Sequence, residues 1–218
     1  MKISMGLTVV AGLALMSAPA VWAGELASYN FSAGPAGVGA DNVTAGSFTA
    51  GPGLSGYAGR SGSGNMYARS TGTYGSALSI GNAISSDDYI SVTIGADSGF
   101  AMDLTSLTFD FGYTRSGGAD GQRFKAYVLT SIDGFVDAGD ITGSKEITVG
   151  AATGTPPYTL VTVDLSGAQF QGITTPTEFR FYLSDTCNYN DFIHRIDNVV
   201  LNGTIVEVVT KPSTIGLL

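Results

Sequence analysis

The stretch Ser106–Tyr113, which reads SLTFDFGY, decides the fold class because its side chains alternate in polarity. Its large apolar side chains recur at every second position and share one face, opposite Thr108 and Asp110; they are Leu107, Phe109, Phe111 and Tyr113. Successive side chains of an extended strand point to opposite faces. The stretch therefore predicts a strand with one buried face and one face in water.

The same period of two recurs along the chain. It is clearest in Asp88–Gly95, Arg123–Thr130, Val161–Leu165 and Phe179–Leu183, and weaker in Leu26–Phe31, Ser76–Ile80, Glu146–Val149, Arg195–Leu201 and Thr204–Val208. No helical period is sustained beyond the first residues, and the 31 glycines favour tight turns, including Asp133-Gly134 and Asn202-Gly203. We predict an all-β fold, an antiparallel β-sandwich of the jelly-roll type.

The N-terminal residues have the features of an export signal. Lys2 precedes the apolar run Leu7–Met16, and a small-residue pattern ends at Ala23. We expect a signal peptide over 1–23, cleaved after Ala23, with an uncleaved anchor as the alternative. The β-sandwich domain is then predicted over 24–206.

Charge and cysteine content narrow the classes of partner. The chain has 10 Lys and Arg against 18 Asp and Glu. No basic stripe is present, so nucleic-acid binding is not expected. Cys187 is the only cysteine, which rules out an intramolecular disulfide and leaves a buried thiol as the simplest interpretation and a free or intermolecularly paired thiol as the alternative.

The residues Pro212–Leu218, PSTIGLL, resemble the start of a PEP-CTERM sorting signal. Thr210-Lys211-Pro212 replaces the usual Pro-Glu-Pro, and the apolar span and arginines do not follow, so 207–218 is interpreted as an incomplete or decayed signal. Phe100–Asp110, Ser131–Phe135 and Arg195–Val199 also resemble strands and turns of the β-sandwich domains of such proteins. The resemblance implies an exported protein of exopolysaccharide-producing bacteria, at the cell surface or outside the cell, which meets the membrane only during export or transient anchoring.

Catalytic motifs are scarce. His194 is the only histidine and no Gly-x-Ser-x-Gly elbow occurs, so a Ser-His-Asp hydrolase is not expected; an edge histidine bonded to a loop is the default. Asp110 and Asp164 lie on polar strand faces and could line a groove, as a glycosidase requires. No local motif ties a carboxylate pair together, so we predict no enzyme and interpret these side chains as solvated.

Calcium is the most credible metal, since it binds carboxylate, carbonyl and amide oxygens. Candidate donors are Asp87, Asp88, Asp133, Asp137, Asp140 and Asp197. Arg195–Val199 is similar to the last strand of jelly-roll carbohydrate-binding modules, in which an Asp often holds a structural calcium ion, and this resemblance implies a Ca²⁺ site at Asp197. The alternative is that Asp197 pairs with Arg195 or with backbone.

A sugar site needs aromatic rings beside hydrogen-bonding groups. The sequence offers two sets of candidates: the strand tyrosines Tyr89, Tyr127 and Tyr182, which point away from the apolar faces, and the loop residues Asn188, Tyr189 and Asn190. The alternative is that strand tyrosines only raise sheet propensity. We therefore expect a non-catalytic surface or matrix protein associated with polysaccharide or envelope components; the alternatives are a calcium-stabilised jelly-roll enzyme acting on glycans and a purely structural surface protein.

Overall fold

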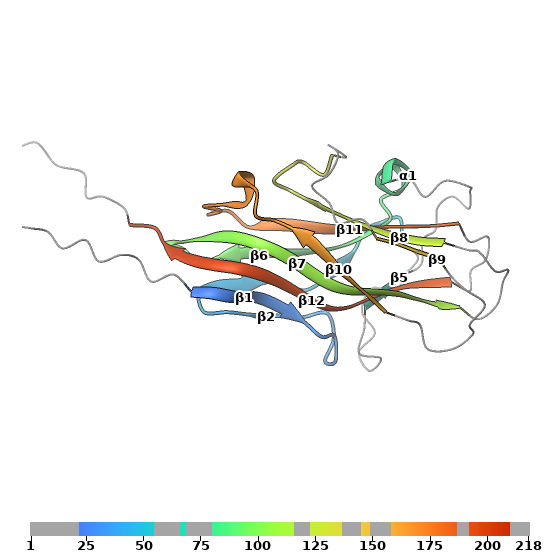
Figure 1. Ribbon diagram of the computed structural model, residues 1–218, viewed down its shortest axis with the longest axis horizontal. Helices are drawn as coiled ribbons and strands as arrows, with labels where there is room; N and C mark the ends of the chain where they lie inside the picture. The colour runs from blue at the N-terminus through green and yellow to red at the C-terminus, as the bar shows by residue number, and fades with distance from the viewer. Residues whose placement is uncertain are drawn as a thin grey trace, which may run out of the picture.

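The structure is a computed structural model, which describes residues 22–54, 66–68, 80–115, 123–136, 145–148, 158–186 and 192–209. In this part of the chain, two antiparallel sheets lie face to face, with one short α-helix and one turn of 3-10 helix, η1 (Ala168–Phe170), outside them (Figure 1). None of the described helices has the length and apolar character needed to cross a membrane.

The first sheet has the long strands β7 and β12 at its centre. Its order is β10 (Thr159–Asp164), β7 (Phe100–Arg115), β12 (Phe192–Glu207), β1 (Trp22–Tyr29) and β2 (Val38–Gly39), with β5 (Met66–Ala68) also pairing with β12. Its strand pairs are all antiparallel.

The second sheet is built around β11. Its order is β3 (Val43–Ala45), β6 (Tyr89–Ala96), β11 (Thr177–Asp185), β8 (Arg123–Thr130) and β9 (Lys145–Thr148), with β4 (Thr49–Ala50) also pairing with β6. From β6 to β8, and again from β9 to β12, the chain changes sheet at every strand. The antiparallel β-sandwich of jelly-roll type predicted from the alternating pattern is confirmed.

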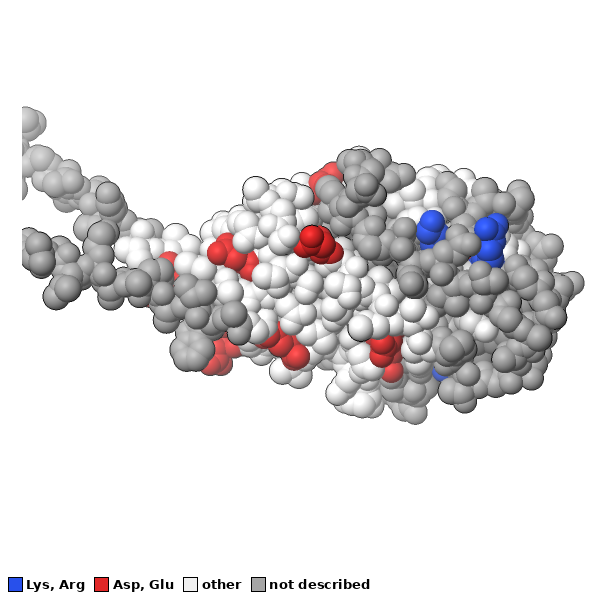
Figure 2. Space-filling view, in the orientation of Figure 1, with Lys and Arg blue, Asp and Glu red and all other residues white. Residues whose placement is uncertain are grey.

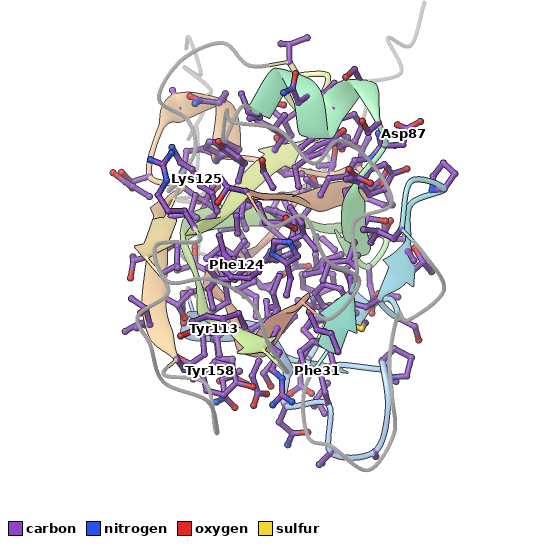
Figure 3. All side chains as sticks on the ribbon, turned by 90° about the vertical axis from the view of Figure 1, so that its right-hand side faces the viewer. Phe31, Asp87, Tyr113, Phe124, Lys125 and Tyr158 are labelled. Carbon is purple, nitrogen blue, oxygen red and sulfur yellow. The ribbon has the colours of Figure 1, made fainter. Side chains whose placement is uncertain are left out.

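The core between the sheets consists of the predicted inward faces. Phe109 of β7 and Phe181 of β11 meet edge to face, with 5.1 Å between ring centroids, and both are fully buried. Figure 3 shows Phe124 of β8 between the two layers. Burying each such side chain contributes roughly 1.5–3 kcal/mol, so this continuous apolar layer is the main stabilising element of the fold.

Two details of the predicted strands are wrong. Arg195–Leu201 and Thr204–Val208 form one strand, β12, and Asn202-Gly203 is not a turn but an irregularity within it. A Cβ on Gly203 would lie 2.3 Å from the carbonyl oxygen of Asp103, so glycine here permits close approach of two strands. Ile80, expected to end a strand, begins helix α1 (Ile80–Ser85).

The ends of the described chain lie together. β1 begins at Trp22 and pairs with the last part of β12, Trp22 opposite Ile205, at the left of Figure 1. Cleavage after Ala23 stays a prediction, and it would remove only the first two residues of β1. Most of the tail over 207–218, from Thr210 on, lies outside the described residues, as does Cys187.

Candidate functional site

The two sheets turn very different outer faces away from the core. The outer face of the first sheet carries a group of mainly polar side chains, which we name the open patch. It consists of Asp110, Tyr158, Leu160, Arg195, Asp197 and Asn198. The outer face of the second sheet, which we name the closed face, is covered by α1. In Figure 3, Tyr158 lies on the opposite side of the sandwich from α1.

Two carboxylates meet at the centre of the open patch. The register of β7 and β12 places Asp110 directly opposite Asp197. Asn198 connects them: its backbone N–H donates to Asp197 Oδ1 over 2.8 Å, and its side-chain Nδ2 donates to Asp110 Oδ2 over 2.9 Å. Both aspartates are candidates in the sequence, but no local pattern pairs them with each other.

A bulge in β12 explains why Asn198 can make both bonds. The register with β7 shifts between Asp197 and Val200, and Asn198 has a φ of 46°. Asparagine tolerates this left-handed conformation better than most residues. The bulge turns the Asn198 side chain out of the sheet, where it is exposed.

An aromatic and a cation adjoin the carboxylates. The guanidinium of Arg195 hydrogen-bonds the hydroxyl of Tyr158, which immediately precedes β10. Arg195 lies opposite Gly112 of β7. Because glycine has no side chain, this position places none between Arg195 and Tyr158. Next to them, the side chain of Leu160 is 65% exposed. The Tyr158 ring and the Leu160 side chain together form an apolar surface beside the charged groups.

The surroundings in the open patch shift the pKa values of Asp197 and Tyr158. Burial raises the pKa of Asp197, the Asn198 N–H lowers it in part, and the charge of Asp110 raises it further. Burial also raises the pKa of the Tyr158 hydroxyl, against the effect of Arg195. The Asn198 amide and the Tyr158 hydroxyl can donate hydrogen bonds and the two carboxylates can accept them, which suits a neutral polar ligand.

The closed face contains the three strand tyrosines. Tyr127 and Tyr182 pack under α1 with Leu129, Ile80 and Ala83. The rings of Tyr89 and Tyr182 lie 5.2 Å apart. The prediction that these rings point away from the main core is confirmed, and the structure brings all three together.

Arg180 fills the space beside these rings. Its Cζ lies 4.4 Å from the centroid of Tyr89 and 3.8 Å from that of Phe135, a cation held between two aromatic faces. Its Nε donates to Glu178 Oε1 over 2.9 Å, and its Nη1 donates to the Tyr182 hydroxyl over 3.4 Å. The Arg180 cation and the Tyr182 hydroxyl are therefore paired within the protein.

A turn after β8 places Phe135 over Arg180. The Asp133 carboxylate accepts hydrogen bonds from the backbone N–H of Thr130 and of Phe135, at 3.3 and 3.0 Å, and Gly134 has a φ of 70°. The turn predicted at Asp133-Gly134 is confirmed. The hydrogen bonds of the Asp133 carboxylate stabilise this turn, and ion binding by Asp133 stays a prediction.

The expectation of exposed tyrosine platforms is wrong for two of the three strand tyrosines. Tyr127 is 5% exposed and Tyr182 is 1% exposed, because α1 covers the polar side of their strands. Ligand binding at Tyr89, whose ring is partly accessible, stays a prediction. The loop candidates Asn188, Tyr189 and Asn190 lie outside the described residues.

The metal prediction also stays a prediction. Within the described ranges, no three His, Cys, Asp or Glu side chains come together to hold an ion. Asp197 has Asp110 and the amide of Asn198 beside it, which are oxygen donors of the kind that Ca²⁺ prefers. Asp87 and Asp88 follow α1, and Asp137 and Asp140 lie outside the described residues.

His194 was expected at an edge and lies instead in the core. It belongs to β12, is 1% exposed, and packs between the rings of Phe111 and Phe124. Its Nε2 lies 2.9 Å from Asp185 Oδ2, which belongs to the other sheet. The pair ties the two layers together.

Sequence reasoning missed Tyr158 and Asn198. Tyr158 follows a proline pair and gives no alternating signal, and the bulge that exposes Asn198 depends on strand register. The Asp-Asn pair of Arg195–Val199 was the only available indication, because Asn is enriched where φ is positive.

Comparisons with known proteins give distant likenesses. No protein-family model and no curated protein matches the chain. Among solved structures, TmCBM27, a carbohydrate-binding module studied for specific mannan recognition, has 13% identity and a TM-score of 0.37, over 84% of this chain and 98% of that one.

Two further solved structures are similar to the same degree. A Stig cyclase from Fischerella sp. TAU has 14% identity and a TM-score of 0.35, over 86% of this chain and 90% of that one. An adhesin domain of Lys-gingipain from Porphyromonas gingivalis has 16% identity and a TM-score of 0.31, over 80% and 95%. We take no function from these likenesses.

Proposed function

We propose that this protein is a non-catalytic, exported surface or matrix protein that binds polysaccharide through the open patch. The observation that carries the proposal is the grouping of Tyr158 and Leu160 with Asp110, Asp197 and Asn198 on one sheet face, over which no described helix or strand lies. Sugar rings offer apolar C–H faces and a rim of hydroxyls, so a ring beside carboxylate and amide groups suits them.

Charge supports a neutral or amino-sugar polymer as the ligand. The chain has a formal net charge of −8. In Figure 2, acidic side chains occupy the left and centre of the visible face, and basic ones lie towards its right-hand end. Polymers of uronic acids would meet repulsion at the Asp110–Asp197 pair, so we expect them to bind weakly.

The test is a binding isotherm against three soluble polymers: a neutral glucan or mannan, a partly deacetylated amino-sugar polymer and a uronate polymer. Tyr158→Ala is expected to weaken binding to the preferred polymer at least about tenfold, the equivalent of roughly 1.4 kcal/mol. Asn198→Gly, which keeps the positive φ and removes the side chain, should weaken it as well.

The matched control lies on the closed face. Tyr89→Phe keeps the ring that stacks on Arg180 and should bind as the unmodified protein does. Binding that is absent from all three polymers, or equal in the Tyr158→Ala and Tyr89→Phe variants, would contradict the proposal and leave a purely structural surface protein as the better account.

The open patch also supports a second candidate function, hydrolysis of a glycan. The observation in its favour is that Asp197 has a raised pKa and faces Asp110, as an acid and its partner do in glycosidases. Incubation of the preferred polymer with the protein distinguishes the two: release of reducing ends that is lost in both Asp110→Asn and Asp197→Asn favours hydrolysis, and binding without release favours the non-catalytic role.

A further inference from the structure

Among the residues that the structure describes, the edge strand β10 pairs only with β7, and half of its backbone hydrogen-bonding groups have no partner. Leu165 N–H donates to the carbonyl of Thr105, directly opposite it in the register that continues β10 onto β7. Alternate residues of an antiparallel strand bond to the same neighbour. The N–H and C=O groups of Leu160, Thr162 and Asp164 therefore point away from β7, towards the free edge of the first sheet.

This edge lacks the devices that usually prevent strand addition. β10 reads TLVTVD, with no proline, no lysine and an unbroken register, and it is the longest described strand with a single neighbour. The side chains of Leu160, Thr162 and Asp164 are all exposed. Long, flat edges rich in β-branched residues and without charges in the middle are the ones that accept another strand.

The sequence of β10 permits antiparallel pairing with a second copy of the same strand. If two copies pair antiparallel about a two-fold axis at Thr162, Leu160 of each copy faces Asp164 of the other. Thr162 faces Thr162, and Val161 faces Val163 on the inner side, which are favourable cross-strand pairs. The only charged residue of the strand, Asp164, then lies at opposite ends of the ribbon in the two copies, so no like charges meet.

We propose that the protein forms a symmetric dimer by antiparallel pairing of β10 with β10 of a second copy, centred on Thr162. All six free backbone groups of each edge are satisfied in this register, and the two first sheets become one continuous sheet. The two open patches then share one face. This inference does not depend on the proposed function, because its test involves no ligand.

The first test is sedimentation of the purified protein over a range of concentrations. The unmodified protein is expected to be a concentration-dependent dimer. Thr162→Pro should be monomeric, since proline removes the outward N–H and blocks the edge while the bonds to β7 remain. Thr162→Ala, which keeps the backbone groups, should still dimerise. Circular dichroism and thermal unfolding verify that each variant is folded.

A charge exchange tests the register itself and does not need the proline variant to fold. Thr162→Lys and Thr162→Glu should each be monomeric, because like charges meet at the two-fold axis. Mixed together they should form a heterodimer, because position 162 faces position 162 only in the proposed register. Native mass spectrometry resolves the two variants by mass.

Three outcomes would overturn the proposal. They are an unmodified protein that is monomeric at every concentration, a Thr162→Pro variant that is folded and dimeric, and a Lys and Glu mixture without heterodimer. A monomer that instead gains a stoichiometric extended peptide at β10 would show that the edge serves a different partner.

Discussion

The closed face and the open patch lie on opposite sides of one sandwich and use similar residue types to different ends. On the closed face, Arg180 is bound by Glu178, Tyr89, Phe135 and Tyr182, and α1 covers the rings. On the open patch, Asp110 lies opposite Asp197, and the side chain of Leu160 is exposed to solvent. Tyr127 and Tyr182, which look suited to ligands in the sequence, are buried within the protein, whereas Leu160 and Asn198 of the open patch are exposed.

The largest expected effect breaks the closed face. Tyr182→Ala removes a fully buried ring from beneath α1 and should lower the free energy of unfolding by roughly 3–5 kcal/mol, as truncations of large buried aromatics do. Urea unfolding followed by circular dichroism measures this. Leu160→Ala, on the open patch, is the control and should change it by less than about 0.5 kcal/mol.

Equal losses in these two variants would mean that the faces do not differ in the way described. A small loss in Tyr182→Ala alone would mean that α1 does not hold the ring.

An intermediate effect is expected from the cation of the closed face. Arg180→Met removes the stacking on two rings and the pair with Glu178, and should cost roughly 1–2 kcal/mol, since the site is partly exposed. Arg180→Lys should recover less than half of this, because an ammonium cannot stack as a planar guanidinium does. Urea unfolding of both variants measures these losses in stability. An Arg180→Lys variant as stable as the unmodified protein would show that the charge alone, and not the stacking, accounts for the effect.

The smallest effect on stability is expected from Asp197 of the open patch. Because the pKa of Asp197 is raised in the folded state, its ionised form disfavours folding, and stability falls as the pH rises through that pKa. Asp197→Asn should therefore raise the free energy of unfolding at pH 7 by less than about 1 kcal/mol. This stabilisation is measured as a rise in the melting temperature. The gain should shrink as the pH falls and vanish below the unfolded-state pKa.

Asp164 provides a control of opposite sign. Hydrogen bonds from Ser166 lower its pKa, so its ionised form favours the folded state above the unfolded-state pKa and loses this effect as the pH falls. Asp164→Asn should thus lower the melting temperature at pH 7. A pH profile in which both variants shift alike would contradict the assigned environments.

Much of the architecture could be predicted because it depends on local alternation. Arg123–Thr130 was predicted with the bounds that β8 has, and the inward residues Phe124, Ala126 and Val128 were assigned to the buried face. The division of β12 at Asn202-Gly203 failed, since a turn dipeptide and a glycine at a close strand crossing have the same local signature. Ile80 was assigned to a strand because a single apolar residue before a polar run carries no period.

The sequence by itself determined that this chain is a two-layered antiparallel fold and which face of each strand is buried, because both follow from the polarity of neighbouring residues. Only the tertiary structure decided which outer face α1 covers. The position of α1 over Tyr127 and Tyr182, the register that sets Asp110 opposite Asp197, and the unpaired edge of β10 all depend on residues far apart in the chain. No local pattern encodes such distances, because pairing is selected by the packing of the whole core.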